Sequence, residues 1–290
     1  MQEGLIACRF VHFGAVLLLL GIGLFRHVLF RSSLQALDAS ATGARLDRGS
    51  VWLAGVALLS ATGWLLLTAA NMAGQWRDAI DAQTMGTVLA HTFFGHVWII
   101  HLALNLLALL LLPRGLRTAP RLILLLCALL LLTLAPVGHG AMYDGIRGQL
   151  LILNQMLHLL GVGTWLGGLV MLAVVLTGAH PVDVRGVLAR FSGIGYGLVA
   201  LIIVTGMINV RALSGGVWPE PAFSGFGLVL SVKVAMVLCM LALAAVNRSL
   251  ARAATLDMPL LRACVLLECG FGGAALAAVS LLGTLPPMLN

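Results

Sequence analysis

The sequence contains few charged and few aromatic residues. Charged side chains make up 9% of its 290 residues and aromatic ones 6%, whereas an ordinary soluble domain has about 25% charged residues. A chain of this length with so little charge could not cover the surface of a water-soluble fold. Stretches of alternating polar and apolar residues are also absent, which argues against an outer-membrane barrel. These absences favour a helical membrane protein.

Motifs for nucleotide chemistry are also missing. The sequence has no phosphate-binding loop of the GxxxxGK[ST] type and no aspartyl-phosphate loop of an ion-pumping ATPase. We therefore expect no direct use of ATP and no enzymatic activity. No pair of cysteines has CxxC spacing, so the cysteines are interpreted as small core residues. They are Cys8, Cys127, Cys239, Cys264 and Cys269.

Long apolar runs predict the architecture. Hydrophobic residues make up 61% of the chain, and several runs exceed the roughly 20 residues that cross a bilayer as a helix. We expect an all-α, polytopic membrane protein with a bundle of eight transmembrane helices, and a short extra helix around 82–91. No shift in composition divides residues 1–290, so we expect a single membrane domain with no soluble domain. The expected spans are 5–30, 50–75, 92–112, 119–137, 148–178, 186–212, 223–247 and 260–285.

The distribution of arginine and lysine predicts the orientation. Twelve basic residues fall in or beside the loops after the first, third, fifth and seventh spans. The opposite face has four: Arg9, Arg77, Arg147 and Arg211. Because cytoplasmic loops carry the excess of basic residues, both termini are expected to face the periplasm from the bacterial inner membrane. This topology accounts for the formal charge of +7, so no nucleic-acid partner is expected.

Histidines gather in the outer half of the predicted domain. A polar side chain inside a bilayer is costly and is a functional candidate. Imidazoles and thioethers together suit copper, particularly Cu(I), although a single methionine is usually packing and a single histidine often fastens two helices. The shared bias toward one face favours a metal site. The residues are His12, His91, His96, His101, His139 and His158, with Met72, Met85, Met142, Met156 and Met207.

The fifth predicted span has a polar stripe along one face. Asn154 and His158 are four residues apart and so lie on the same side of a helix. Gly161 and Trp165 continue the stripe. The small residues of GVGTWLGG would let another helix approach closely. A histidine next to an asparagine on such a face is a candidate metal ligand with a supporting partner, or a fastening between helices.

Two full charges are expected deep inside the membrane. They are Lys233 in the seventh predicted span and Glu268 in the eighth. With a hydrocarbon core of roughly 30 Å, their depths are expected to differ by only a few ångströms. Because buried charges need partners, we expect an intramembrane ion pair, either a clamp between helices or an element coupled to transport.

A series of motifs resembles the CopD/PcoD family of copper-resistance inner-membrane proteins. The resemblance covers nearly the whole chain, and the order and spacing of the motifs are more specific than any one of them. They are RFVHFGAVLLLLG with Arg9 and His12, TFFGHVW, the GHG turn, NQMLHLLGVGTWLGGL, RFS at 190–192, TGMINV at 205–210, Lys233, NR at 247–248 and LE ending at Glu268.

The resemblance implies an eight-helix inner-membrane protein that takes up periplasmic copper, as Cu(I) or Cu(II). It points to His12, His139 and His158 as ligands, with Asn154 beside the last. A separate CopC-like periplasmic carrier and membrane lipid are the other implied partners. We add Met142 and His96 to the candidate ligands. The remaining candidates, along a pathway, are Met156, Met72, Met207 and Trp165.

Three functions remain open at this point. The leading hypothesis is a permease that carries copper from the periplasm toward the cytoplasm. The inner half is poor in ligands, which favours a periplasm-facing copper receptor or relay without transport. A b-type haem protein is the third, because histidines at matched depths can hold haem, although the GHG turn has no role in it. Its candidate ligands are His12, His96, His101 and His158.

Overall fold

The computed structural model describes residues 1–138, 143–178 and 182–285. Over these residues the chain is helical, without β-strands. The elements in order are α1 (Gln2–Leu24), the π-helical η1 (Phe25–Leu29), α2 (Gln35–Asp38), α3 (Ala41–Ala73), the 3₁₀ turn η2 (Trp76–Ala79), α4 (Ala82–His91), α5 (Phe93–Thr118), α6 (Pro120–Leu132), α7 (Gly145–Thr177), α8 (Val184–Ser214), α9 (Gly225–Arg252) and α10 (Met258–Leu282).

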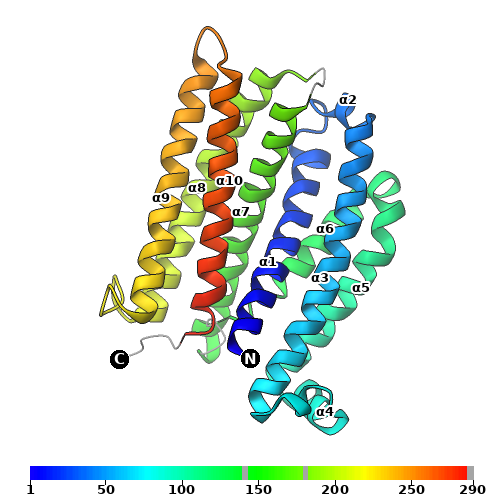
Figure 1. Cartoon of the computed structure of the whole chain (residues 1–290), viewed down its shortest axis with the longest axis vertical. Coiled ribbons are helices and arrows are strands. Elements are labelled where there is room, and N and C mark those ends of the chain that lie inside the picture. The colour runs from blue at the N-terminus through cyan, green and yellow to red at the C-terminus, as the bar shows by residue number, and fades with distance from the viewer. Residues whose placement is uncertain (139–142, 179–181, 286–290) are drawn as a thin grey trace.

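The helix count confirms the expected class of fold. In the described part of the chain, seven helices are long and apolar enough to cross a membrane, and α6 is a shorter apolar helix. The start of α1 and the end of α10 lie at the same end of the bundle (Figure 1), which requires an even number of crossings. The short α6 therefore makes the eighth. The extra helix expected around 82–91 is α4.

Several helices are longer than the sequence predicted. The second expected span began at 50, but α3 begins at Ala41, where Ser40 caps it by accepting from the N–H of Thr42. A helix of 33 residues is about 50 Å long and exceeds a hydrocarbon core of about 30 Å. Hydropathy marks only the part of a helix that lies in lipid, so it underestimates helices that continue into water.

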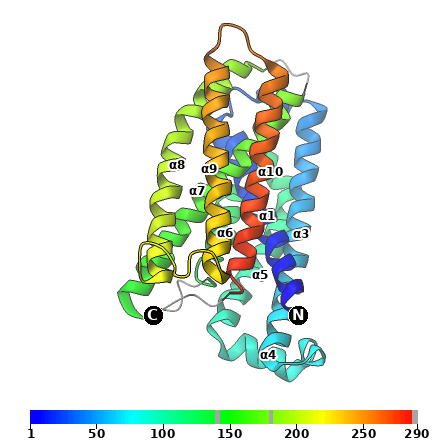
Figure 2. The same cartoon turned by 60° about the vertical axis from the view of Figure 1, so that its left-hand side comes forward.

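Helix α1 occupies the centre of the bundle. It packs against α3 and α6 on one side and against α7 and α10 on the other, as Figure 1 shows. In Figure 2, α8 lies at the opposite side of the bundle from α3. Helix α5 lies outside α3 and α6, while α8 and α9 cover α7 and α10. Side chains on α1 can therefore meet partners from either half of the chain.

Glycines bring α1 and α7 into backbone contact. A Cβ on Gly21 would overlap the carbonyl oxygen of Gly163 and lie 2.8 Å from the Cα of Gly167. Small residues are the usual means by which membrane helices approach closely. The close approach predicted for GVGTWLGG is confirmed, and its partner is α1.

The break between α5 and α6 follows from Pro120. Proline disfavours the helical conformation in the residue before it and is well placed at the first position of a new helix. Ala119 accordingly leaves the helical region, with φ −142° and ψ 57°.

At the other end of the bundle, Asp81 is the N-cap of α4. Its carboxylate accepts hydrogen bonds from the backbone N–H and from the side chain of Thr84, which hold the pKa of Asp81 below its usual value.

A buried arginine ties the far ends of α1 and α3 together. Arg26 in η1 is 2% exposed. Its Nε donates to Asp38 at 2.9 Å and its Nη1 to Asp47 at 3.0 Å. Sequence reasoning counted Arg26 only as a charge of the cytoplasmic loop, and the spacing to the two aspartates carries no signal that would have identified this cluster.

Candidate metal sites in the outer half

The expected site residues fall into two separate clusters and several isolated positions. We call the end of the bundle where α1 begins the outer end, because the charge distribution predicts that it faces the periplasm. His139 and Met142 lie outside the described residues. His12 and His158 lie in different clusters, which we call the histidine pair and the α7–α8 cluster.

The histidine pair joins α1 to α5. The Nε2 atoms of His12 and His101 are 2.8 Å apart, and both side chains are completely buried. Nδ1 of His12 lies 3.0 Å from the carbonyl oxygen of Ala57 and 3.0 Å from Oγ of Ser60, both in α3. Nδ1 of His101 lies 2.7 Å from Oγ1 of Thr133, just beyond α6. Three helices and the turn after α6 thus position the two rings.

Tryptophans enclose the histidine pair. The ring of Trp98 stacks on His101 with centroids 4.6 Å apart, and the ring of Trp64 meets His12 edge-on at 5.8 Å. The Nε1 of Trp98 donates to the carbonyl of Ala61 at 3.0 Å, which fixes the indole. Two rings clamped in this way are held in defined orientations by packing as well as by hydrogen bonds.

The α7–α8 cluster contains amide, hydroxyl and imidazole groups. The Nδ2 of Asn154 donates to the carbonyl of Thr205 at 2.9 Å and to Oδ1 of Asn209 at 2.8 Å. Asn209 in turn donates to Gln155 at 2.7 Å. Nδ1 of His158 lies 2.9 Å from Oγ1 of Thr205. The predicted stripe of Asn154 and His158 therefore faces α8.

The hydrogen bonds of Thr205 assign the tautomer of His158. The hydroxyl of Thr205 donates its one proton to the carbonyl of Leu201, so it accepts a proton from Nδ1 of the histidine. Nε2 of His158 then keeps its lone pair. A ring held through Nδ1–H with a free Nε2 is the usual arrangement of a metal-binding histidine.

The two clusters lie at the same depth but face different helices. Helices α1 and α7 run in the same direction (Figure 1), and the side chain of Leu17 packs against Gly163. His12 precedes Leu17 by five residues, and His158 precedes Gly163 by five residues. His12 points toward α3 and α5, whereas His158 points toward α8. The structure therefore does not bring His12 and His158 together.

Other candidates lie apart from both clusters. His96 is exposed, and its Nε2 lies 2.8 Å from the carbonyl oxygen of Ala90. Met72 is 57% exposed and Met207 65% exposed. Met207 is two residues from Thr205 and therefore on another face of α8. Met156 packs into the apolar core around the histidine pair.

The expected ion pair between Lys233 and Glu268 is wrong. Among the described residues, the ion pairs are those of Arg26, and Glu268 accepts instead from Nδ2 of Asn247 at 3.1 Å. Asn247 lies 14 residues beyond Lys233 on α9, which is about 21 Å along a helix. The depths of Lys233 and Glu268 estimated from the sequence were wrong because they assumed helices that fit the hydrocarbon core, and α9 is longer than that core.

Lys233 and Trp165 instead lie near different parts of the site. Lys233 lies near His158, so it belongs to the surroundings of the α7–α8 cluster. Trp165 is 6% exposed, and its Nε1 has no hydrogen-bond partner among the described residues. Its ring packs against that of Phe191, with the ring centroids 6.2 Å apart.

Sequence reasoning missed four contributors to these clusters. His101 was counted among the outer-half histidines that favour a metal site, but it was chosen as a candidate ligand only for haem. Thr205 and Asn209 lie within the quoted TGMINV motif, and their spacing of four residues places them on one helical face. That spacing was the available signal. Nothing in the sequence indicated Thr133 as the partner of His101.

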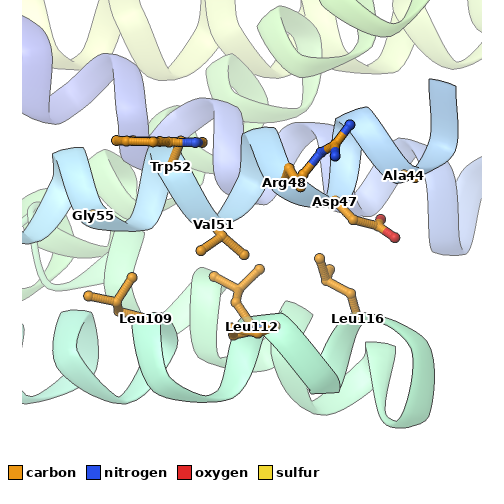
Figure 3. Close-up of a pocket in the computed structure, with 10 residues that line it drawn as sticks. Ala44, Asp47, Arg48, Val51, Trp52, Gly55, Leu109, Leu112 and Leu116 are labelled. Atoms are coloured by element: carbon orange, nitrogen blue, oxygen red, sulfur yellow. The ribbon is translucent and has the colours of Figure 1, made fainter. Parts of the chain in front are cut away.

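A groove between α3 and α5 lies away from both clusters. Its volume is about 730 Å³, and it opens near the inner end of these helices. Figure 3 shows Trp52 and Arg48 on α3 across from Leu109 and Leu112 on α5, with Val51 between them. The lining offers no imidazole, thiol or thioether. We therefore do not assign metal binding to this groove.

The described residues hold no preformed cage for a metal ion. No group of three or more His, Cys, Asp or Glu side chains is placed to bind one in the described part of the chain. The histidine pair offers two nitrogens, and the α7–α8 cluster offers one imidazole nitrogen beside amide and hydroxyl oxygens. Imidazole nitrogen is a ligand that suits copper.

The fold and the two clusters define a multi-pass helical membrane protein with buried imidazole sites in one half of the bundle. Residues 1–149 match the family model of the copper resistance protein D-like N-terminal domain, and residues 185–282 match that of copper resistance protein D. The chain belongs to this copper resistance protein D family. It is a multi-pass protein of the bacterial inner membrane.

Named relatives support this membership. The chain is 28% identical to inner membrane protein YebZ of Escherichia coli (strain K12), covering 97% of this chain and 98% of the relative. It is 28% identical to copper resistance protein D of Pseudomonas syringae pv. tomato, over 98% and 97%. It is 27% identical to copper transport protein CutJ of Bacillus subtilis (strain 168), over 87% of this chain and 47% of the relative. No solved structure matches.

Proposed function

We propose that this protein is a copper permease that accepts copper at the outer end and carries it toward the cytoplasm. The proposed ligands are His158 and His12, with His139, Met142 and His96 nearer the periplasm. Asn154 supports His158 in this scheme, and a separate CopC-like carrier delivers the copper. The membrane potential favours inward movement of a cation by roughly 2.3 kcal/mol per charge per 100 mV.

The observation that carries this proposal is the environment of His158. Its Nδ1 is engaged by Thr205, which leaves Nε2 free to bind a metal. The ring is half-buried rather than fully enclosed. Asn154 and Asn209 order the neighbouring backbone and side chains. A copper resistance family and a ligand-ready histidine together support copper as the ion that is bound.

A copper receptor or relay without transport is the second candidate. The inner half of the bundle beyond the clusters is packed with apolar side chains, among them Phe25, Leu169, Leu172 and Phe191. Only scattered candidate ligands lie there, among them Met171 and Met240, and a cation would be costly to move through hydrocarbon. This packing favours a protein that binds copper at the outer end and passes it to a partner.

Haem binding has less support. The imidazoles of His12 and His101 are in hydrogen-bonding contact, which leaves no room for a macrocycle between them. His96 is bonded to the backbone at the exposed start of α5, and His158 faces Thr205 on α8. These four histidines therefore do not form facing pairs around a flat cavity in this structure.

Copper entry into proteoliposomes tests the proposal. The full-length protein is reconstituted with a copper-sensitive dye inside, and copper is added outside. We expect entry in the wild type, loss of entry in His158→Ala, and wild-type entry in His91→Ala. His91 is the matched control because it is an exposed histidine at the end of α4, outside both clusters. Bound copper without entry would favour the relay instead.

A further inference from the structure

We propose that His12 and His101 together form a two-coordinate Cu(I) site inside the bundle. This inference deepens the proposed function, on which it rests, by naming the oxidation state of the ion and a ligand on α5. It concerns a pair of nitrogens from two distant parts of the chain that converge at 2.8 Å. Neither ring contacts solvent.

The backbone of α3 prepares His12 to bind a metal. The carbonyl of Ala57 can only accept a hydrogen bond, so Nδ1 of His12 carries its proton. The hydroxyl of Ser60 donates to the carbonyl of Val56 at 2.6 Å, and it therefore also accepts from Nδ1. Nε2 of His12 is left with a lone pair that points at His101.

The hydroxyl of Thr133 lets His101 offer its own lone pair. Without metal, Nε2–H of His101 donates to Nε2 of His12, and its Nδ1 accepts from Thr133. The oxygen of Thr133 also lies 2.7 Å from the carbonyl of Leu130. When the hydroxyl donates to Leu130 instead, Nδ1 of His101 can carry the proton and Nε2 is free. The ring changes tautomer, and the neutral pair neither gains nor loses a proton.

The geometry favours a two-coordinate ion. Metal–imidazole bonds are about 2.0 to 2.1 Å long, so an ion between the two Nε2 atoms needs them roughly 4 Å apart. A separation of about 1 Å more than the present 2.8 Å converts the hydrogen bond into a linear N–Cu–N unit. Cu(II) prefers four ligands in a square or tetragonal arrangement, and the surrounding Trp64 and Trp98 supply none.

A thiol lies between the pair and the outer end. Cys8 precedes His12 by four residues and thus lies on the same face of α1, one turn closer to the outer end. Its Sγ donates to the carbonyl of Ser60 at 3.3 Å, the same residue that holds His12. Cys8 is half-buried, whereas the histidines are not exposed at all. A soft ligand at this position gives Cu(I) a step on its way to the pair.

X-ray absorption at the copper edge tests this site directly. The full-length His158→Ala protein is purified in detergent and loaded with one equivalent of Cu(I) under reducing, oxygen-free conditions. We expect a two-coordinate spectrum with two nitrogen neighbours. The same variant with His101→Gln, which keeps a polar side chain at the position, should lose at least tenfold in Cu(I) affinity measured against a competing chelator. His91→Ala in the same background should keep the full affinity.

Three results would overturn the proposal. They are no Cu(I) binding by His158→Ala, a three- or four-coordinate spectrum, or unchanged affinity after His101→Gln. If the histidine variants fail to fold, the wild-type spectrum decides, because a two-nitrogen component must be present in it. Failure of the proposed function is a separate result, since copper entry can be absent while the two-coordinate Cu(I) remains bound.

Discussion

At the scale of single residues, the outer half depends on hydroxyl groups that set the tautomers of histidines. Thr205 fixes His158 and Thr133 contacts His101, and the oxygen of each hydroxyl also lies within hydrogen-bonding distance of a nearby backbone carbonyl. Such partners orient a metal-binding imidazole and raise its basicity. Serine and threonine commonly bond back to their own helix in this way, so their contribution is easily mistaken for local structure.

The role of Thr205 leads to a first prediction. In Thr205→Val, the hydroxyl is replaced by a methyl group of similar shape, and Nδ1–H of His158 loses its acceptor. Loss of such a supporting partner typically lowers metal affinity 10- to 100-fold. We expect a copper affinity reduced by about this factor in a competition titration.

Thr62→Val is the control for Thr205→Val. Thr62 also bonds back to its own helix, at 3.0 Å from Leu58, but it is exposed and touches neither cluster. The prediction is contradicted if both valine variants bind copper with equal affinity.

At the scale of the helices, the contact of α1 with α7 places the two clusters side by side. Gly21 meets Gly163 and Gly167 through backbone atoms, so the distance between these helices is set by the absence of side chains. Because α1 also carries His12 and α7 carries His158, a change in this contact moves both clusters. We therefore expect these glycines to help position both clusters.

Gly21→Ala provides the second prediction. The added methyl group overlaps the carbonyl of Gly163, and backbone atoms cannot move aside as a flexible side chain can. Overpacking typically costs about 1–3 kcal/mol, and we expect a lower unfolding temperature in detergent together with weaker copper binding. Gly55→Ala is the matched control, since a Cβ at Gly55 meets no atom within 4 Å. Equal melting of the two variants would refute the importance of this contact.

At the scale of the whole molecule, charges inside the membrane are widely separated. Lys233 is the one lysine of the sequence and lies near His158. Glu268 lies about 21 Å further along the bundle, where Asn247 holds it. The bundle therefore keeps its basic and acidic intramembrane groups in different halves.

This separation gives the third prediction. Because sites more than about 10 Å apart without shared partners combine additively within about 0.3–0.5 kcal/mol, Lys233→Met and Glu268→Gln should have additive effects on unfolding in detergent. A double-mutant cycle measures this. Strong coupling between the two substitutions would contradict this separation and would support the ion pair expected from the sequence.

The orientation of the bundle is the subject of the fourth prediction. Val217 lies in the loop between α8 and α9 and Thr255 in the loop between α9 and α10, at opposite ends (Figure 1). In a background without native cysteines, Val217→Cys should react with a membrane-impermeant thiol reagent added to intact spheroplasts, and Thr255→Cys should react only after lysis. The reverse pattern would place both termini in the cytoplasm.

The sequence alone determined the class of fold, the order of the spans and the family. Hydropathy and the distribution of arginine are properties of local sequence, so eight crossings and α4 could be read from them. The stripe of Asn154 and His158 and the small residues of α7 also followed from helical periodicity, since residues four apart share a face whatever the partner helix is.

The tertiary structure alone decided which side chains meet. His12 and His101 are 89 residues apart, and nothing local indicates that α1 and α5 place their imidazoles in contact. Periodicity gives the face of a helix but not the helix it faces, and hydropathy locates a residue in the membrane without fixing its depth. For this reason the pairing of Lys233 with Glu268 was wrong, while the histidine pair and the partners of His158 emerged only from helix packing.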